Sequence, residues 1–229
     1  MYVTECPYCG QRVRKRAPKL DPEAERAPRR RRRPPSLPRL RRDEIPGIAP
    51  ETRPYATIVL IAAALGTSLA WVAGLSLLDL GAIIGPIGSE WWRLPAYAFV
   101  HTNVGSLFAT MIATGLFGML LERRFGSAAV LATFLLGATA GGALTVAVEV
   151  YPAIGANGGA LALLVAWLVD DRLAERRGDE RSNDLIGVAV IAGVLLLLPL
   201  ADDDTSWAAG VGGAGAGAVI GALISPLRR

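Results

Sequence analysis

The chain contains 229 residues, of which 52% are hydrophobic and 19% are charged, and its formal net charge is +4. The charged residues lie outside long apolar runs, a pattern that excludes a water-soluble globular protein. We expect an all-α, polytopic membrane protein, because an open sheet edge cannot be satisfied in lipid. No nucleic-acid partner is expected, since membrane topology accounts for the basic excess.

Residues 1–10 contain Cys6 and Cys9, spaced as Cys-x-x-Cys and followed by Gly10. This spacing is typical of half a zinc knuckle, where a tight turn aims two thiolates at one metal. A structural zinc needs four ligands, but the chain has no third Cys, and its one His is His101. The sequence thus leaves two interpretations, a zinc ion shared between chains or with a partner, and a half knuckle without metal. A redox role would require a strand-to-helix context, which the following tail does not supply.

Residues 11–54 are rich in Arg and Pro and include the run from Arg29 to Arg33. Such a segment cannot bury enough apolar surface to offset its chain entropy, so we predict a disordered cytoplasmic tail. Its basic residues favour the anionic headgroup region, where each contributes about 1 kcal/mol. Residues 1–54 are also the segment through which a cytoplasmic protein partner could bind.

Residues 55–229 contain the apolar runs that we interpret as a membrane domain of six helices. About 20 apolar residues are needed to cross roughly 30 Å of hydrocarbon, and several runs reach this length. The two shorter runs, 156–169 and 185–200, either cross the membrane together with their flanking residues or lie inside the bundle. The runs are 56–78, 104–121, 127–148, 156–169, 185–200 and 207–224.

The distribution of basic residues supports an even number of spans with both termini in the cytoplasm. With this topology, Arg93 is the single exception among the 24 Lys and Arg residues, and all the others lie in inner segments. Asp202 to Asp204 then fall in the last outer loop. Because cytoplasmic loops carry the excess of Lys and Arg, we expect a multi-pass protein of the cell (plasma) membrane.

Four sequence blocks recur in a fixed order along these runs and resemble the rhomboid family of intramembrane serine proteases from Ser89 onward. Each block alone is weak, but four in register within a six-helix topology are specific. The resemblance implies a six-helix rhomboid-like bundle with an outer loop half-immersed beside it. The blocks are Glu90-Trp91-Trp92-Arg93 with Phe99-Val100-His101, Gly118-x-x-x-Glu122-x-x-x-Gly126, Gly155-Ala156-Asn157-Gly158, and Ala209-Gly210-Val211-Gly212-Gly213 with Gly217.

The positions that carry chemistry in the family differ in this chain. Asn157 stands where the resemblance implies the nucleophilic serine, and Gly210 stands where it implies the general base. Ser106 and Thr110 replace the His and Asn that help stabilise the oxyanion. An Asn amide cannot be activated as a nucleophile, so the sequence predicts a scaffold without protease chemistry and no catalytic residue.

The positions that keep the family pattern have structural roles independent of catalysis. Small residues let helices approach closely in lipid, so we expect the glycines of 207–224 to pack against neighbouring helices. Glu122 is expected to bind loop amides or pair with Arg124, and His101 to order the outer loop. Trp91, Trp92 and Tyr97 are assigned to the interfacial aromatic belt. The residues assigned structural roles are Trp92, Arg93, His101, Gly118, Glu122, Gly126, Gly155, Gly158, Gly212, Gly213, Gly215 and Gly217.

Three functions fit these observations. The leading one is a pseudoprotease that binds transmembrane helices of membrane clients without cleaving them, in sorting, quality control or regulation. The second is an active rhomboid endopeptidase with displaced residues, for which His101 and Ser106 are the nearest pair in sequence. These two are spaced five apart, whereas side chains that face each other on a helix are spaced three or four apart. The third is a structural subunit of a membrane complex. The expected partners are the lipid bilayer and client helices, and no cofactor is expected in the membrane domain.

Overall fold

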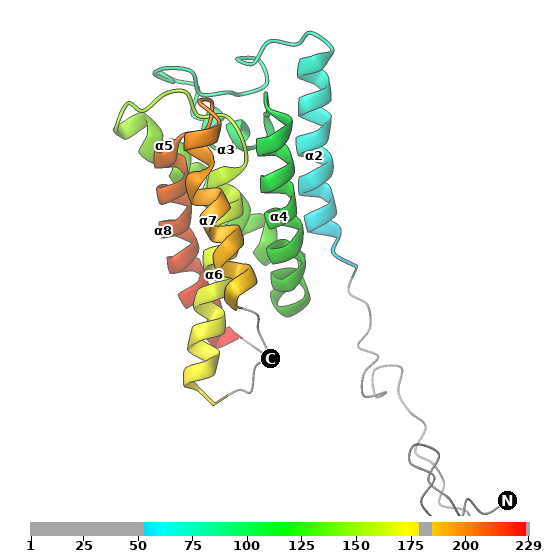
Figure 1. Ribbon diagram of the computed structural model, residues 1–229, viewed down its shortest axis with the longest axis vertical. Helices are drawn as coiled ribbons and strands as arrows, with labels where there is room; N and C mark the ends of the chain where they lie inside the picture. Colours follow the sequence, from blue (N-terminus) through cyan, green and yellow to red (C-terminus); the bar gives the residue numbers. More distant parts are fainter. Residues whose placement is uncertain (1–52, 179–184, 228–229) are drawn as a thin grey trace, which may run out of the picture. The chain divides into compact units, whose positions relative to one another are not determined.

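A computed structural model describes residues 53–178 and 185–227, which form one helical unit (Figure 1). The half knuckle at Cys6 and Cys9 and almost all of the basic tail lie outside these residues. Within them the regular structure is helical, apart from one isolated bridge between Ile83 and Ala153. The helices are α2 Tyr55–Val72, α3 Arg93–Ala96, η1 Tyr97–Phe99, α4 Val104–Phe125, α5 Ser127–Ala147, α6 Asn157–Arg176, α7 Leu185–Ala201, α8 Trp207–Ile224 and η2 Ser225–Leu227.

The six predicted runs correspond to the six long helices of the described residues. Four of these helices, α2, α4, α5 and α8, are long and apolar enough to cross a membrane. Helix α7 has 17 residues, and α6 carries Asp170, Asp171 and Arg172 near its C-terminal end. The all-α membrane class is therefore confirmed, whereas the span of α6 and α7 stays a prediction.

Helix α6 forms the core of the unit. Its residues are buried from Asn157 to Leu164, and again at Ala166 and Trp167. It packs against α4, α5 and α8, and the Trp167 ring lies 5.5 Å from that of Phe117 on α4. Because so many of its side chains are Ala or Gly, neighbouring helices approach its backbone.

The closest approach is between α6 and α8. A Cβ atom on Gly213 would lie 2.0 Å from the carbonyl oxygen of Gly158, and one on Gly217 would lie 2.4 Å from that of Ala162. The same relation recurs one turn later at Gly221, 2.6 Å from the carbonyl oxygen of Ala166. Small residues spaced four apart therefore form one continuous seam along α8.

Two other glycines of α8 lie outside this seam. Gly212 faces α5, where its Cβ would lie 2.7 Å from the carbonyl oxygen of Ala140. Gly215 has open space within 4 Å of its Cβ position, so the prediction that it packs against a neighbouring helix is wrong. It follows Gly213 by two residues, which turns it about 200° away from the seam.

Tyr97 also differs from its prediction. Its side chain is 1% exposed, whereas Trp91 and Trp92 are 73% and 40% exposed. The Tyr97 ring lies beside Gly142, and its hydroxyl lies beside Gly141 and Gly158. The assignment of Tyr97 to the interfacial belt is therefore wrong, because glycines on α5 and α6 open a space in the core that its ring fills.

Glu122 ties three helices together at the end of α4. Its carboxylate accepts hydrogen bonds from the amides of Ala56 and Thr57, at 2.8 and 2.9 Å, and from the Thr57 hydroxyl at 2.7 Å. The Ser127 hydroxyl donates a fourth at 2.5 Å. The amides at the start of α2 thus find their acceptor on another helix. Arg124 is not the partner of Glu122, since it pairs with Asp170 at 2.9 Å.

Two glycines near Glu122 allow α2, α4 and α5 to meet closely at this carboxylate. Gly118 faces Thr57, and a Cβ on Gly118 would lie 2.8 Å from the Thr57 hydroxyl oxygen, so its lack of a side chain lets α2 approach α4. Gly126 separates α4 from α5 with a φ of 85°, a conformation that favours glycine.

Candidate functional site

The loop before α6 places Asn157 at the first position of that helix. Gly155 has a φ of 103°, and its amide donates to the carbonyl of Tyr97 at 3.1 Å. The Ile154 amide donates to the carbonyl of Asp204 at 2.9 Å. The loop is thus held by two other segments of the chain, and Asn157 is only 2% exposed.

Gly210 of α8 lies directly against Asn157. A Cβ atom at Gly210 would be 2.9 Å from the Asn157 Nδ2 atom and 3.0 Å from Cδ1 of Leu161. The Oδ1 atom of Asn157 is buried and accepts no hydrogen bond from the part of the chain that the structure describes. Two positions that came from separate sequence blocks therefore meet at one point between α6 and α8.

His101 lies on the other side of the loop and joins it to α4. Its Nε2 atom accepts a hydrogen bond from the Ala156 amide at 3.2 Å and lies 3.2 Å from the Thr110 hydroxyl oxygen. Its Nδ1 atom lies 3.3 Å from the carbonyl oxygen of Phe99. An acceptor at Nε2 and a donor at Nδ1 define the neutral imidazole.

Burial favours this neutral form as well. Desolvation lowers the pKa of His101 to about 4, against the smaller opposing effects of the Phe99 carbonyl and the negative charge of Asp202. The side chain is 3% exposed. His101 therefore acts as an uncharged tie between the loop and α4.

Ser106 and Thr110 are both engaged within the first turns of α4. The Ser106 hydroxyl donates to the carbonyl of Asn103 at 3.0 Å, and the Thr110 hydroxyl donates to that of Ser106 at 2.7 Å. Asn103 caps the helix, because its side-chain oxygen accepts from the Gly105 amide at 2.7 Å. No hydrogen bond links His101 with Ser106 among the residues described.

Asp204 is a site residue that the sequence did not indicate. Its carboxylate accepts a hydrogen bond from the Thr102 hydroxyl at 2.5 Å, while its backbone carbonyl holds Ile154. Asp202 orders the same turn by accepting from the Thr205 hydroxyl at 3.2 Å. The sequence marked these residues only as outer-loop charge, since their partners lie far away in the chain.

Trp92 and Arg93 lie in the segment between α2 and α4. Arg93 pairs with Glu90 at 2.8 Å, donates to the Ala82 carbonyl at 3.3 Å, and lies 5.5 Å from the centre of the Trp92 ring. These contacts fix the fold of that segment. They engage both terminal guanidinium nitrogens of Arg93, whereas its buried Nε has no hydrogen-bond partner among the described residues.

The chemistry available at this point follows from its side chains. Position 157 offers an amide, position 210 offers no side chain, and the nearby imidazole has both nitrogens engaged. Within residues 53–178 and 185–227, no group of three or more His, Cys, Asp or Glu side chains is arranged to hold a metal ion. The site can therefore donate and accept hydrogen bonds.

Comparison with known proteins identifies the scaffold. The family model described as the rhomboid domain matches residues 88–227, which is more than half of the chain. RHOMBOID-like protein 9, chloroplastic, from Arabidopsis thaliana is 29% identical over 106 residues. That similarity covers 46% of this chain and 24% of the plant protein's length. The match from residue 88 agrees with the resemblance that began at Ser89, and the chain belongs to the rhomboid family of membrane proteins.

Proposed function

We propose that this rhomboid is a pseudoprotease that binds transmembrane helices of membrane clients without cleaving them. The observation that carries the proposal is the contact between Asn157 and Gly210. An amide nitrogen cannot replace a serine hydroxyl as the attacking group, and glycine cannot accept its proton. The nucleophile and the base are therefore both missing at positions that lie against each other.

No neighbouring pair supplies a substitute for them. His101 accepts a hydrogen bond from Ala156 at Nε2, so its lone pair is already used. The hydroxyl beside it belongs to Thr110, which is 1% exposed and donates within its own helix. A displaced dyad would have to break both interactions and open a path for water, so the geometry disfavours an active peptidase.

The dimensions of α7 support client binding. Its 17 residues correspond to about 25 Å of helix, which is shorter than the roughly 30 Å of a bilayer core. Only Leu195 and Leu198 of this helix are buried. A short helix thins the adjacent bilayer and so lowers the cost of holding a client helix that is short or polar.

The orientation and location belong to the same proposal. Both termini are placed in the cytoplasm of a plasma-membrane protein, with the His101 side of the bundle outside. The basic tail would then meet a cytoplasmic partner, and a zinc ion shared by Cys6 and Cys9 of two chains would join them. Zinc analysis of the full chain and of Cys6→Ser tests this last part.

A fluorophosphonate probe, which reacts with activated serines, tests the absence of catalysis. The full chain in liposomes is expected to remain unlabelled, and so is Asn157→Ser, because the base is still missing. The double variant Asn157→Ser/Gly210→His supplies both groups and is the positive control for the scaffold. Labelling of the unaltered chain that is lost in His101→Ala would overturn the pseudoprotease proposal.

Client binding needs a separate experiment. A photo-crosslinking residue placed at Val190 of α7, which is 60% exposed, should capture transmembrane segments of several proteins in native membranes. The matched control carries the same crosslinker at Val59 of α2, which is 59% exposed. Capture of one fixed partner at both sites would instead indicate a structural subunit of a complex.

A further inference from the structure

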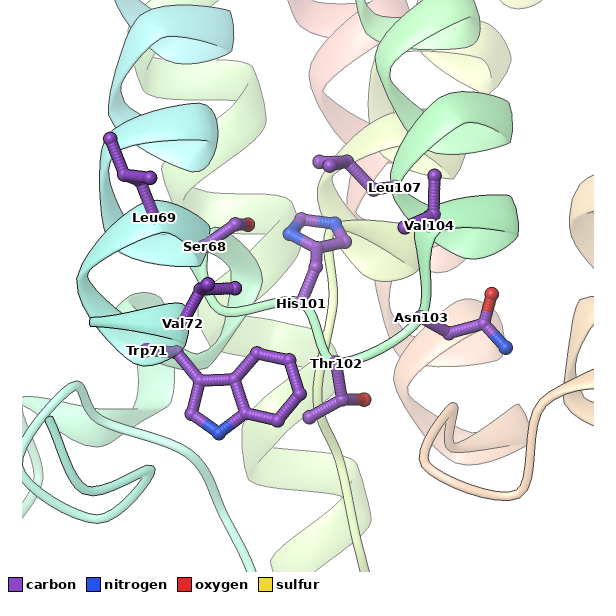
Figure 2. Close-up of a pocket in the computed structure, with 9 residues that line it drawn as sticks. All are labelled: Ser68, Leu69, Trp71, Val72, His101, Thr102, Asn103, Val104 and Leu107. Atoms are coloured by element: carbon purple, nitrogen blue, oxygen red, sulfur yellow. The ribbon is translucent and has the colours of Figure 1, made fainter. Parts of the chain in front are cut away.

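A cavity of about 230 Å³ lies between the outer ends of α2 and α4, apart from the contact between Asn157 and Gly210 (Figure 2). Figure 2 shows the His101 ring between the side chains of α2 and Leu107 of α4. The lining residues are Ser68, Leu69, Trp71, Val72, His101, Thr102, Asn103, Val104 and Leu107.

The lining favours an apolar occupant. It contains no Asp, Glu, Lys or Arg, and aliphatic side chains come from both helices. Several of its polar groups already have partners within the chain. Ser68 donates to the carbonyl of Ala64, Thr102 donates to Asp204, and the Asn103 side-chain oxygen caps α4. A ligand with hydrogen-bonding groups would therefore find few partners for them in the cavity.

The mouth of the cavity is continuous with the surface that meets lipid. Leu69 and Val72 on α2 are 70% and 73% exposed, and Val104 on α4 is 79% exposed. Helix α2 ends at Val72 and α4 begins at Val104, so the cavity lies at the boundary of the bilayer. The indole of Trp71 at this level is typical of a membrane interface.

The size of the cavity favours a chain rather than a small solute. An apolar cavity of about 150 Å³ is known to accept one benzene molecule, and this one is half as large again. Side chains that line an empty cavity lack dispersion contacts on one side, so a hydrocarbon chain that enters from the lipid gains these contacts. We propose that the cavity binds one acyl chain of a membrane phospholipid, with its ester end near Thr102 and its hydrocarbon between Leu69 and Leu107.

The test uses the full chain in liposomes that contain phosphatidylcholine with a photoreactive diazirine on one acyl chain. We expect adducts to concentrate on residues 68–72 and 102–107. Ser68→Phe fills the cavity and should reduce these adducts to the level of other exposed positions. Ala62→Phe adds the same side chain to an exposed position of α2 outside the cavity and should leave them unchanged.

Two results would overturn the proposal. Adducts spread evenly over all exposed apolar residues, and insensitive to Ser68→Phe, would show that only bulk lipid was sampled. Protection of residues 68–72 by a co-purified transmembrane segment would show that a client side chain is the occupant. Circular dichroism of both Phe variants separates loss of the site from loss of the fold.

Discussion

The seam between α6 and α8 predicts a large difference between two glycines of the same helix. In Gly213→Ala the new Cβ would lie 2.0 Å from the carbonyl oxygen of Gly158, whereas ordinary contact begins at 3.4 Å. Helix α8 must therefore retreat by about 1.4 Å at this point. Gly217 and Gly221 make the same approach along α8, so the retreat also loosens their contacts.

The matched control is Gly215→Ala, whose Cβ would enter open space. Both substitutions gain about 1 kcal/mol from the higher helix propensity of alanine, so this gain cancels in the comparison. Overpacking typically costs 1–3 kcal/mol, and the loosened neighbours add to it. We expect Gly213→Ala to be less stable than Gly215→Ala by about 3 kcal/mol.

Reversible unfolding in mixed micelles, followed by circular dichroism during a titration with dodecyl sulfate, measures this difference. The two alanine variants are compared with the unaltered chain under one detergent composition. Equal free energies of unfolding for the two variants would show that α8 does not approach α6 at backbone distance, and the described seam would be wrong.

Three further predictions concern other parts of the bundle. Glu122→Gln removes the negative charge and replaces one carboxylate oxygen, which accepts from two of the four donors, with an NH2 group that cannot accept. Because hydrogen bonds to charged groups contribute about 1.5–3 kcal/mol each, the same titration should show a clear loss of stability. Unchanged stability would contradict the tie between α2 and α4. The pKa of His101 falls from 6.5 to about 4 on folding, so the unfolded chain binds the proton first as the pH decreases. The free energy of unfolding should therefore fall between pH 6.5 and 4, and it should fall less in His101→Gln. Identical pH profiles for the unaltered chain and His101→Gln would contradict the buried, neutral state of His101. A reporter near Gly178 should be cytoplasmic and one near Asp203 external, and a cytoplasmic result for both would refute the six-span topology.

The sequence predicted the parts of the fold that depend on local spacing. Gly213 and Gly217 are one helical turn apart, so their common face follows from helix geometry. The sequence predicts loop amides or Arg124 as the partners of Glu122, whereas the amides that it binds lie at the start of α2 and Arg124 pairs with Asp170. Helix phase alone also turns Gly215 away from Gly213, which agrees with the open space at its Cβ position.

Other features depend on contacts that no local pattern reveals. Tyr97 has the character of an interfacial residue, and its burial depends on glycines contributed by two other helices. Asp204 reaches Thr102 across more than half of the bundle sequence. The roles of such residues can be assigned only from the packed structure, because they depend on the space and the hydrogen-bond partners that other helices provide.

Asn157 at the start of α6 and Gly210 on α8 constrain each other. With Asn157 in place, even the Cβ of a residue at position 210 would lie 2.9 Å from its amide nitrogen, so a histidine there would be overpacked. Serine has no amide group and would release this space. We therefore expect Gly210→His to be destabilising by about 2 kcal/mol beside Asn157, and far less so in combination with Asn157→Ser. A double-mutant cycle of unfolding free energies measures this coupling. Additive effects would mean that positions 157 and 210 do not interact energetically, whereas coupling means that the asparagine side chain occupies the space that the glycine leaves.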